Sequence, residues 1–384
     1  MHRVLLLGAG KIGRMAAKFL AHTGDYDLLV ADADGEALSR VELAEGVPVR
    51  NIDAADPAQL RSAMEGRDSV ISALSYHFNP AIAEAALDKD LSYFDLTEDV
   101  ATTRHVRTIA ERARPGQIFM PQCGLAPGFV SIAAFHLTQG FDEVETVHMR
   151  VGALPQFPTN ALKYNLTWST DGLINEYCNL CEVIHDGRRI QALPLEGLDH
   201  FSLDGVHYEA FNTSGGAGTL CETLEGHVRE LNYKTIRYVG HRDLMLFLTE
   251  ELRLSQRREL LKEILEQAIP VTYQDVVVIF CTVTGRQGEK LVQASDARKI
   301  YRQTIDGQCW SAIQVTTAAA LCAALDLHVA HQLPRQGFVR QEQIDFDEFL
   351  ANRFGRYYQS HAATHFSSPH STPAGAPYAD GHAD

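Results

Sequence analysis

The residues with the clearest chemical signature are three glycines near the N-terminus. Gly8, Gly10 and Gly13 form a G-x-G-x-x-G pattern, and Lys11 and Ile12 fill the gap between the last two. The pattern follows a short apolar segment and opens a stretch of helical spacing, which is the context in which it binds a dinucleotide. Gly8 permits a tight turn, Gly10 leaves room for a diphosphate, and Gly13 lets the helix approach the strand. Backbone amides at the helix N-terminus favour phosphate, so we expect the cofactor site here.

An acidic residue follows at the distance expected of a ribose-binding side chain, about 20 residues downstream. This residue, Asp32, ends the second predicted strand. A 2′-phosphate at this point would meet Asp32, Asp34 and Glu36, and the nearest arginine, Arg40, comes late in the chain for a phosphate partner. The sequence therefore predicts NAD rather than NADP. FAD is a minor alternative, because flavin enzymes use the same loop.

Two further segments follow predicted strands at the sheet edge where ligands bind. Asp53 comes after the third strand, and it either borders the adenine or serves as a turn or capping carboxylate. The loop of residues 73–79 comes after the fourth strand and is expected beside the nicotinamide. We assign Ala73 and Leu74 to the cofactor. Tyr76 is a candidate substrate contact, with packing beneath the loop as its alternative.

These residues require a parallel sheet, and the first third of the chain has the matching pattern. Apolar, strand-like segments alternate with segments of helical spacing. The expected strands cover 3–7, 27–31, 48–52, 69–73, 92–96 and 117–120. The expected helices cover 11–23, 36–43, 57–64, 80–87 and 104–112. Such alternation implies right-handed crossovers, so the predicted fold class is α/β with a Rossmann-type, doubly wound parallel sheet.

Beyond residue 141 the pattern becomes that of a second, mixed α+β domain. Strands are expected over 144–151, 162–170, 207–212, 234–239 and 271–283, and a charged helix over 255–267. The alanine-rich run 311–328 is too apolar for a surface helix, so we expect it between domains or at a subunit interface. We place the domains at 1–125, 126–305 and 306–358. Residues 359–384 lack periodicity and are interpreted as a disordered tail.

Four stretches of the sequence resemble the saccharopine dehydrogenase family, and most closely its lysine 6-dehydrogenases. They are the glycine loop, residues 72–79, residues 123–128, and the pair 210–216 with 233–241. The resemblance implies a Rossmann domain, an inserted substrate domain and C-terminal helices that return to the first domain. It also implies oxidation of the side-chain carbon–nitrogen bond of saccharopine or lysine, which yields α-aminoadipate semialdehyde.

The implied reaction needs a neutral amine, and a free lysine amine has a pKa of about 10.4. The site must therefore remove a proton, and a base with a pKa near neutrality serves best. His241, in the family-like stretch, and Asp95, at the end of the fifth strand, are the candidate catalytic groups. As alternatives, His241 is a buried structural histidine and Asp95 a capping carboxylate.

The amino-acid end of the substrate carries a carboxylate, which Arg237 can bind with two hydrogen bonds. Lys234 and the turn that contains Thr213 and Ser214 are further substrate-binding candidates, although the turn could be purely structural. Residues 97–99, Thr-Glu-Asp, stand where lysine 6-dehydrogenases have a glycine-rich segment. This departure lies near the expected site and leaves the exact substrate open.

Lysine and saccharopine share the product and the hydride step, so the sequence does not separate them. Saccharopine has two further carboxylates and would need additional cations, for which Arg150, Lys163 and Arg229 are available. A second possibility is the reverse chemistry, a reductive condensation of an aldehyde with an amine, as in polyamine-forming relatives. A third is a module that binds NAD without turnover.

Composition excludes several other classes of protein. The 384 residues include 34 Lys and Arg against 49 Asp and Glu, a net charge of −15 that disfavours nucleic-acid and anionic-membrane binding. Seven scattered cysteines are typical of free thiols, so we expect a cytoplasmic protein. Cys178, Cys181 and His185 lack a second ligand pair, so we expect no metal. The expected partners are a small amino-acid substrate and further copies of the chain, as a homodimer or larger homo-oligomer.

Overall fold

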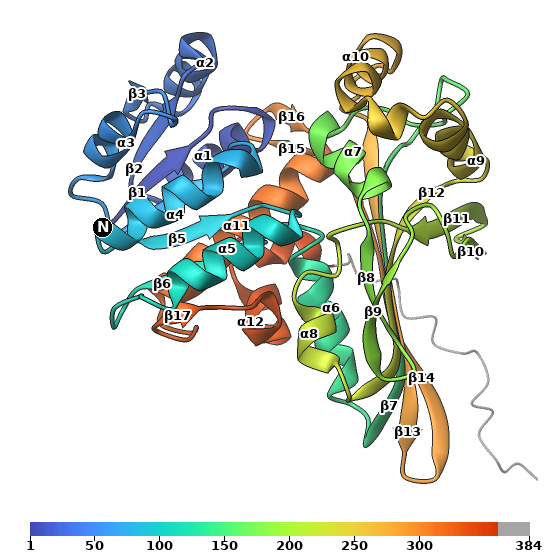
Figure 1. The fold of residues 1–384 in the computed structure, drawn as a ribbon. Coiled ribbons are helices and arrows are strands. Elements are labelled where there is room, and N and C mark those ends of the chain that lie inside the picture. The colour runs from blue at the N-terminus through green and yellow to red at the C-terminus, as the bar shows by residue number, and fades with distance from the viewer. Residues whose placement is uncertain (360–384) are drawn as a thin grey trace, which may run out of the picture.

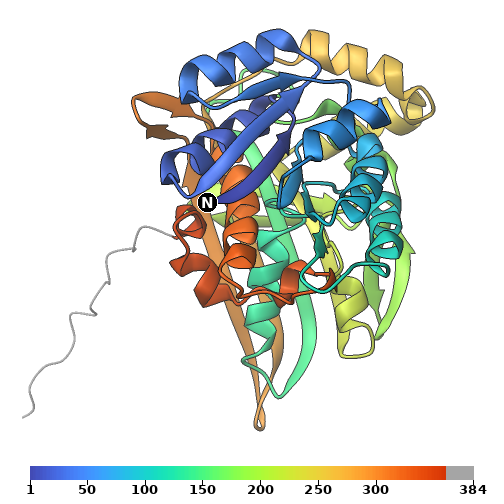
Figure 2. The same ribbon diagram turned by 90° about the vertical axis from the view of Figure 1, so that its left-hand side faces the viewer.

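The computed structural model describes residues 1–359, and its elements are built around two β-sheets (Figure 1). The predicted tail lies outside the described residues except for its first residue. A seven-stranded sheet occupies one side of the molecule, and an eight-stranded sheet with much longer strands occupies the other. The helix α11 (Ala312–Val329) runs between the two sheets (Figures 1 and 2).

The first sheet is parallel throughout, and its strands run in the order β17-β6-β5-β4-β1-β2-β3. Its strands are β1 (His2–Leu7), β2 (Tyr26–Asp32), β3 (Val49–Asn51), β4 (Ser69–Ser72), β5 (Ser92–Asp95), β6 (Ile118–Met120) and β17 (Gly337–Phe338). The order reverses between β1 and β4, which is the switch point of a doubly wound sheet and the place where such folds bind ligands. This confirms the predicted fold class.

Helices cover both faces of this sheet, as the near-continuous apolar strands require. They are α1 (Lys11–Thr23), α2 (Gly35–Glu45), α3 (Pro57–Met64), α4 (Asn79–Asp88) and α5 (Val100–Ala110), with the short 3-10 helix η1 (Tyr76–Phe78). Residues 4 to 7 of β1 are completely buried. The bounds of α1 and α3 agree with the prediction because each has strong end signals. Asp56 caps α3 with its carboxylate, and Gly24 ends α1 in a left-handed conformation.

The second sheet is mixed, with the order β10-β11-β12-β7-β13-β14 and the pair β8–β9 attached to β12. Its strands are β7 (Glu143–Pro155), β8 (Cys181–His185), β9 (Arg188–Ala192), β10 (Asp199–Leu203), β11 (Val206–Asn212), β12 (Val228–Tyr238), β13 (Asp275–Gln287) and β14 (Lys290–Tyr301). Further elements are α6 (Phe129–Thr138), α7 (Thr170–Cys178), α8 (Leu220–Leu224), α9 (His241–Leu246), η2 (Phe247–Glu251), η3 (Leu254–Gln256) and α10 (Arg258–Ala268). The helix α6 packs on β7, β13 and β14.

The C-terminal part of the chain returns to the first sheet, as predicted. It comprises the hairpin β15 (Gln303–Ile305) and β16 (Gln308–Trp310), then α11, β17, η4 (Gln341–Gln343), α12 (Phe346–Ala351) and η5 (Gly355–Tyr358). The helix α11 packs on α1 and β13, and β17 adds a strand beside β6. By length and composition α11 could span a membrane, but 78% of it is buried inside the protein, as in the core helix of a folded domain.

Two segment predictions for the second half of the chain are wrong. Residues 162–170 were expected as a strand, but they form an irregular segment that ends at the start of α7. Its apolar residues are buried against α10 and neighbouring helices rather than in a ladder. The twelve-residue strand β14 was not predicted. Its side chains alternate between exposed and half-buried, and this pattern contains few large apolar residues.

Candidate active site

A cavity of about 500 Å³ lies between the two sheets, at the carboxyl ends of the parallel strands. It has two walls. The Rossmann wall comprises residues 10–12, 73–76, 96–98 and 124–127 together with Ile313 and Thr317. The other wall comprises Val151, Ala153, Trp168, Ser169, Thr170, Asp171, Glu176, Tyr233, Thr235, Arg237 and Glu266. The cavity therefore joins the predicted cofactor loop to the family-like strand β12.

The glycine loop has the geometry of a diphosphate site. Gly8 has a φ of +107°, and a Cβ at Gly13 would overlap the carbonyl oxygen of Gly8. Gly10 has no neighbour within 4 Å of where a Cβ would stand, so its outer side is open. The first turn of α1 has no side-chain cap, so its amides are free to receive an anion. Lys11 and Ile12 follow Gly10 in the wall of the cavity.

Asp32 stands at the end of β2 and holds the loop. Its carboxylate accepts hydrogen bonds from the amide of Ala9 at 2.6 Å and from the amide of Asp34 at 2.9 Å. Asp53 is exposed, and its carboxylate accepts the amide of Ala55 at 2.9 Å, which is the turn role that the sequence left open. Contact of either acid with an adenosine stays a prediction.

A second, larger depression of about 840 Å³ lies on the other side of the first turn of α1. Its wall also contains Gly10 and Lys11, so the two cavities meet at the glycine loop. Four cationic side chains and one carboxylate line it, namely Lys11, Arg14, Arg40, Arg302 and Asp34. The hairpin β15–β16 closes it with Trp310, over whose ring the Arg14 guanidinium stands at 5.7 Å.

The loop after β4 lies where the sequence placed it. Ala73, Leu74 and Tyr76 all line the 500 Å³ cavity. Tyr76 belongs to η1, and its ring lies against that of His77 in a tilted arrangement, at 4.0 Å between centroids. The position of these residues, beside the glycine loop and facing β12, is compatible with the cofactor and substrate contacts predicted for them.

Arg237 lies at the base of the cavity and is almost fully buried. Its Nε donates to the hydroxyl of Tyr177 at 2.8 Å, and its Nη1 donates to Thr235 Oγ1 at 2.7 Å and to a backbone carbonyl. The remaining nitrogen, Nη2, is 3.8 Å from Glu176 Oε2. The protein thus occupies Nε and Nη1 of the guanidinium and leaves Nη2 for a ligand, which agrees with a carboxylate-binding role.

His241 does not line the cavity, which corrects the placement expected for a catalytic base. Its Nδ1 lies 2.7 Å from the carbonyl of Leu162 and its Nε2 lies 3.0 Å from the hydroxyl of Tyr177. The carbonyl requires a proton on Nδ1, so we assign Nε2 as the acceptor of the tyrosine proton. Burial and the nearby Arg237 lower the pKa of His241 to about 3. His241 therefore orients Tyr177 and, through it, Arg237.

Asp95 is also displaced from the cavity, because it is completely buried beneath the loops that form the wall. Its carboxylate accepts the Tyr93 hydroxyl at 2.6 Å, the Asn79 amide at 3.1 Å, and the backbone amides of Thr97 and Gln122 at 2.9 and 3.0 Å. Burial raises the pKa of Asp95 to about 6. These bonds join the ends of β5 and β6, so the observed role of Asp95 is structural support.

Three of the predicted substrate-binding residues lie away from the cavity wall. The ammonium of Lys234 donates to Asp199 at 2.7 Å and to the backbone carbonyl of Gly197. These contacts lie on the face of β12 opposite to the face that carries Arg237. The hydroxyl of Ser214 donates to the carbonyl of Leu180 at 3.0 Å, and Thr213 is buried. The structure corrects their expected placement, since neither Lys234 nor this turn faces the ligand space.

The turn that contains Thr213 and Ser214 continues into two glycines, and the space around these glycines gives the turn its structural role. Gly215 has a φ of +85°, and a Cβ there would overlap the carbonyl oxygen of Glu98. A Cβ at Gly216 would overlap the ring of Tyr233. Both Glu98 and Tyr233 line the cavity, so the turn acts by allowing two wall residues to approach closely.

The sequence analysis missed two acidic residues in the wall, Glu98 and Glu176. Burial raises the pKa of Glu98 to about 7, and it raises that of Glu176 to about 8 although Arg237 opposes the shift. These are the cavity carboxyls whose pKa values suit proton transfer near neutrality. Glu98 was noticed as a departure from the family pattern. Glu176 gives no local signal, because it belongs to no motif and lies on a short helix for which no element was predicted.

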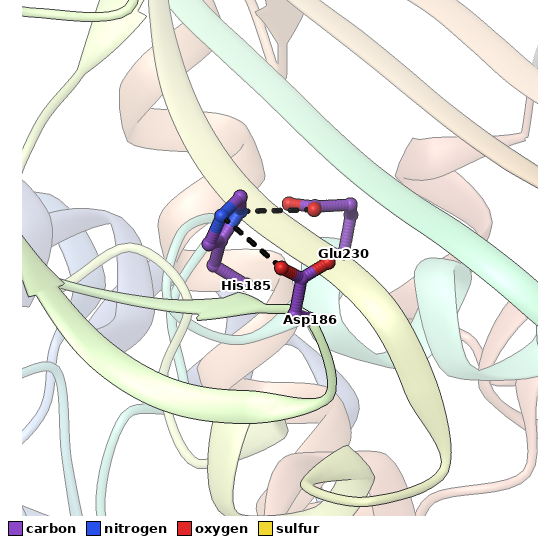
Figure 3. A group of neighbouring side chains, drawn as sticks. All are labelled: His185, Asp186 and Glu230. Atoms are coloured by element: carbon purple, nitrogen blue, oxygen red, sulfur yellow. Dashed lines mark ion pairs between the residues drawn. The ribbon is translucent and has the colours of Figure 1, made fainter.

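One group of neighbouring metal-ligand side chains occurs among the described residues, far from either cavity (Figure 3). His185 lies 2.9 Å from Glu230 and 3.7 Å from Asp186. His185 and Asp186 are exposed, and the ion pairs account for the arrangement without a cation. His185 points toward these acids at the tip of the β8–β9 hairpin (Figure 3). We therefore assign no metal site to it.

Comparison with known proteins agrees with the two-sheet arrangement. Relatives include saccharopine dehydrogenase (NADP+, L-glutamate-forming) of Saccharomyces cerevisiae, which is 22% identical over 328 residues, 79% of this chain and 69% of the yeast protein. Mitochondrial alpha-aminoadipic semialdehyde synthase of Mus musculus is 22% identical over 179 residues, which are 45% of this chain and 19% of the mouse protein. The solved apo structure of the yeast L-Glu-forming enzyme superposes with a TM-score of 0.75 at 16% identity, covering 91% of this chain and 96% of that one.

Family models match nearly the whole described chain. The saccharopine dehydrogenase NADP binding domain matches residues 4–120, which hold the first six strands and the glycine loop. The saccharopine dehydrogenase C-terminal domain matches residues 124–356, which hold the second sheet, α11 and the returning segments. The chain is an oxidoreductase with an NAD(P)-binding Rossmann domain, and it belongs to the saccharopine dehydrogenase family.

Proposed function

We propose that this protein is a dehydrogenase that uses a nicotinamide dinucleotide to oxidise the side-chain carbon–nitrogen bond of lysine or saccharopine. One observation supports it most directly. A single cavity joins the glycine loop, the loop after β4, a buried arginine whose Nη2 has no hydrogen bond to the protein, and two carboxyls with near-neutral pKa values. These are the parts that the reaction needs, namely a hydride acceptor site, a carboxylate anchor and a proton acceptor.

The residues present fit the cofactor. The open outer side of Gly10 and the uncapped amides of α1 provide the diphosphate cradle, and the loop of residues 73–76 borders the neighbouring space. A bound oxidised nicotinamide supplies the acceptor for a hydride from the carbon next to the nitrogen. The chain itself anchors the substrate through Arg237, removes a proton from the amine, and excludes water with the two walls of the cavity.

The charges of the cavity favour lysine over saccharopine. Its cationic residues are Lys11 and Arg237, whereas its acids are Glu98, Asp171, Glu176 and Glu266. Saccharopine carries three carboxylates and would meet this excess of acids, whereas lysine carries one carboxylate and two amines. The three cations considered for the extra carboxylates, Arg150, Lys163 and Arg229, do not line the cavity. Arg150 pairs with Asp199 at 2.8 Å instead.

The cofactor has two candidates, each favoured by a specific observation. NAD is favoured by Asp32, Asp34 and Glu36, which stand at the end of β2 where a ribose would lie. NADP is favoured by the depression beside the glycine loop, where Arg14, Arg40 and Arg302 could receive a 2′-phosphate. Arg40 is paired with Glu36 at 2.8 Å, so a phosphate would have to compete with that carboxylate. We retain NAD as the proposed cofactor for this reason.

An absorbance assay at the NADH and NADPH band tests the proposal. Lysine and saccharopine are each offered with NAD and with NADP. We expect reduced cofactor with lysine and NAD. Production of reduced cofactor with saccharopine alone would overturn the substrate choice, and production with NADP alone would overturn the cofactor choice. Oxidation of NADH only when an aldehyde and an amine are both supplied would support the reductive condensation.

Arg237→Lys separates the enzyme from a module that binds NAD without turnover. The lysine keeps the charge but loses the bond to Tyr177 and the second donor for a carboxylate. We expect KM for the amino acid to rise about 10- to 100-fold while the affinity for NAD stays unchanged, since a charge-assisted bidentate contact contributes about 1.5–3 kcal/mol. Arg112→Lys is the matched control, because Arg112 is exposed and pairs with Glu84 on the surface. A module without turnover would produce no NADH from any amino acid.

A further inference from the structure

We infer that Glu176 and Arg237 together bind the α-ammonium and α-carboxylate of an amino-acid substrate, and that Glu98 takes the proton of the reacting amine. This inference rests on the proposed function and names the groups that perform it. It assigns a substrate class, an α-amino acid with a second amine at the other end of its side chain. Glu98 would be a catalytic residue and Glu176 a binding residue.

Glu176 and Arg237 lie side by side in the cavity, and their charges are unlike when Glu176 is ionised. The Glu176 side chain is 8% exposed, and its Oε2 has no hydrogen-bond partner in the structure. A buried carboxyl oxygen without a partner is costly, so its retention in a ligand cavity indicates a missing donor. Arg237 Nη2 lies 3.8 Å away, too far for a hydrogen bond. An ammonium and a carboxylate on one carbon would satisfy both groups.

Glu98 lies on the Rossmann wall of the same cavity, whereas Glu176 and Arg237 lie on the other wall. It follows β5, and the backbone on either side is fixed because Thr97 donates its amide to Asp95 and Asp99 caps α5. Glu98 Oε1 lies within 3.0 Å of the point where a Cβ on Gly172 would stand, so α7 packs against it. The loops that share this wall, residues 73–76 and the glycine loop, are those of the cofactor site.

The two glutamates are therefore separated by role as well as by position. Glu176 stands beside the arginine that would hold the carboxylate, so it meets the α-amine. Glu98 stands beside the cofactor loops, so it meets the amine whose carbon loses the hydride. A substrate that spans the cavity from Arg237 to the cofactor places its second amine at Glu98, and this geometry fits a linear diamino acid.

Several charged groups surround the pair and set its protonation. On the segment of Glu98 itself two carboxylates raise its pKa, and across the cavity Glu98 raises that of Glu176. The other charged and titratable groups around the two glutamates are Asp95, Asp99, Arg237, Tyr164 and Tyr177, with the ion pair of Arg104 and Glu182 in a smaller neighbouring cavity. Both carboxyls therefore exchange protons near neutral pH.

The proton step balances without any further reactant. The substrate ammonium gives one proton to the Glu98 carboxylate, which leaves a neutral amine and a carboxylic acid. Hydride then passes from the adjacent carbon to the oxidised nicotinamide, with the nitrogen lone pair forming the carbon–nitrogen double bond. Water adds to the iminium carbon, and the amine leaves to give the aldehyde. Glu98 returns its proton to solvent or to the departing amine.

Glu98→Gln and Glu176→Gln give different expected results in steady-state kinetics with lysine. Glu98→Gln should lower kcat about 100-fold or more and remove the rise of kcat with pH near neutrality, because a positioned base contributes about 10²- to 10⁴-fold. Glu176→Gln should raise KM about 10- to 100-fold and keep the shape of the pH profile of kcat. Glu263→Gln, an exposed residue of α10, is the matched control for loss of one negative charge. Wild-type kcat and pH profile in Glu98→Gln would overturn the base, and wild-type KM in Glu176→Gln would overturn the binding pair.

A binding measurement keeps this inference separate from the proposed function. The chain has two tryptophans, and Trp168 lines the cavity whereas Trp310 lines the other depression. In a Trp310→Phe background, lysine and norleucine, which lacks the second amine, are titrated against Trp168 fluorescence. We expect lysine to bind, and Glu176→Gln to weaken it about tenfold or more. Lysine binding without NADH production would defeat the proposed reaction alone. Equal binding of lysine by Glu176→Gln and wild type would defeat the inference whatever the turnover.

Discussion

Removal of the buried carboxyl at position 176 should change how the stability of the protein depends on pH. The folded pKa of Glu176 is about 8, raised from 4.5 mainly by burial. Between these values the folded state holds a proton that the unfolded chain releases, so this carboxyl's contribution favours folding at low pH. That stability is complete below the unfolded pKa and is lost as pH rises toward the folded pKa. The glutamine in Glu176→Gln cannot titrate, so the loss should be absent.

The size of the effect follows from the width of that window. We compare stability at about pH 5.5 and about pH 8.5. Within this range the folded state holds one proton more than the unfolded state over a little more than two pH units, and at about 1.36 kcal/mol per unit this corresponds to about 3 kcal/mol. Wild type should therefore lose about 3 kcal/mol more stability over this range than Glu176→Gln does.

Urea unfolding followed by Trp168 fluorescence, in a Trp310→Phe background, measures this difference at the site itself. The comparison uses the slope with pH rather than the absolute stability, because the variant also leaves the buried guanidinium of Arg237 without its neighbouring acid. Glu263→Gln should retain the wild-type slope. If wild type and Glu176→Gln lose stability equally with rising pH, to within about 0.5 kcal/mol, Glu176 does not hold a proton in the folded state and the reasoning is refuted.

Three further changes test the fold and the cofactor site. Gly216→Ala places a Cβ on the ring of Tyr233 and should cost about 1–3 kcal/mol by overpacking, seen in the urea midpoint; an unchanged midpoint would show that the ring can move. Asp275→Ala removes the carboxylate that accepts two backbone amides in the first turn of α11, at 2.6 and 3.0 Å. The free energy of unfolding should fall by about 1–3 kcal/mol in the same assay. Wild-type stability of Asp275→Asn would show that the charge is dispensable. Arg40→Ala should weaken NADP about tenfold and leave NAD unchanged in Trp310 fluorescence titrations, and equal losses for both would exclude a phosphate contact.

Local signals made the first domain predictable. The glycine spacing, the capping residue before α3 and the Gly24 stop after α1 act within a few residues, so the element bounds could be derived without the tertiary structure. The doubly wound parallel sheet could be predicted because regular alternation of strands and helices permits few topologies. The long strand β14 could not be derived, because it is held by pairing with β13 rather than by its own apolar pattern.

Of the residues predicted for the site, those on the loop after β4 line the cavity, whereas two candidates that are deeply buried do not. Family-like motifs marked the loop after β4 and Arg237, and both line the cavity. His241 belongs to such a motif and Asp95 ends a predicted strand, but their side chains are fully enclosed and bonded to protein groups. Sequence spacing shows which residues come to the sheet edge, and it does not show which side chain turns toward the ligand. The position of Glu176 in the cavity wall depends on how α7 packs in three dimensions, which the sequence does not show.

The two cavities that meet at the first turn of α1 have different sets of charged side chains, and this difference bears on how a ternary complex would be arranged. The cofactor-side depression has four cations against Asp34, and the substrate cavity has four acids against Lys11 and Arg237. The chain as a whole has a net charge of −15, so the cationic depression is a local feature that the composition does not reveal. An anionic dinucleotide is therefore drawn to one side of the helix N-terminus and a basic substrate to the other. The same separation would repel a tricarboxylate from the substrate side, which is why the choice between lysine and saccharopine is the most direct test of the charges described here.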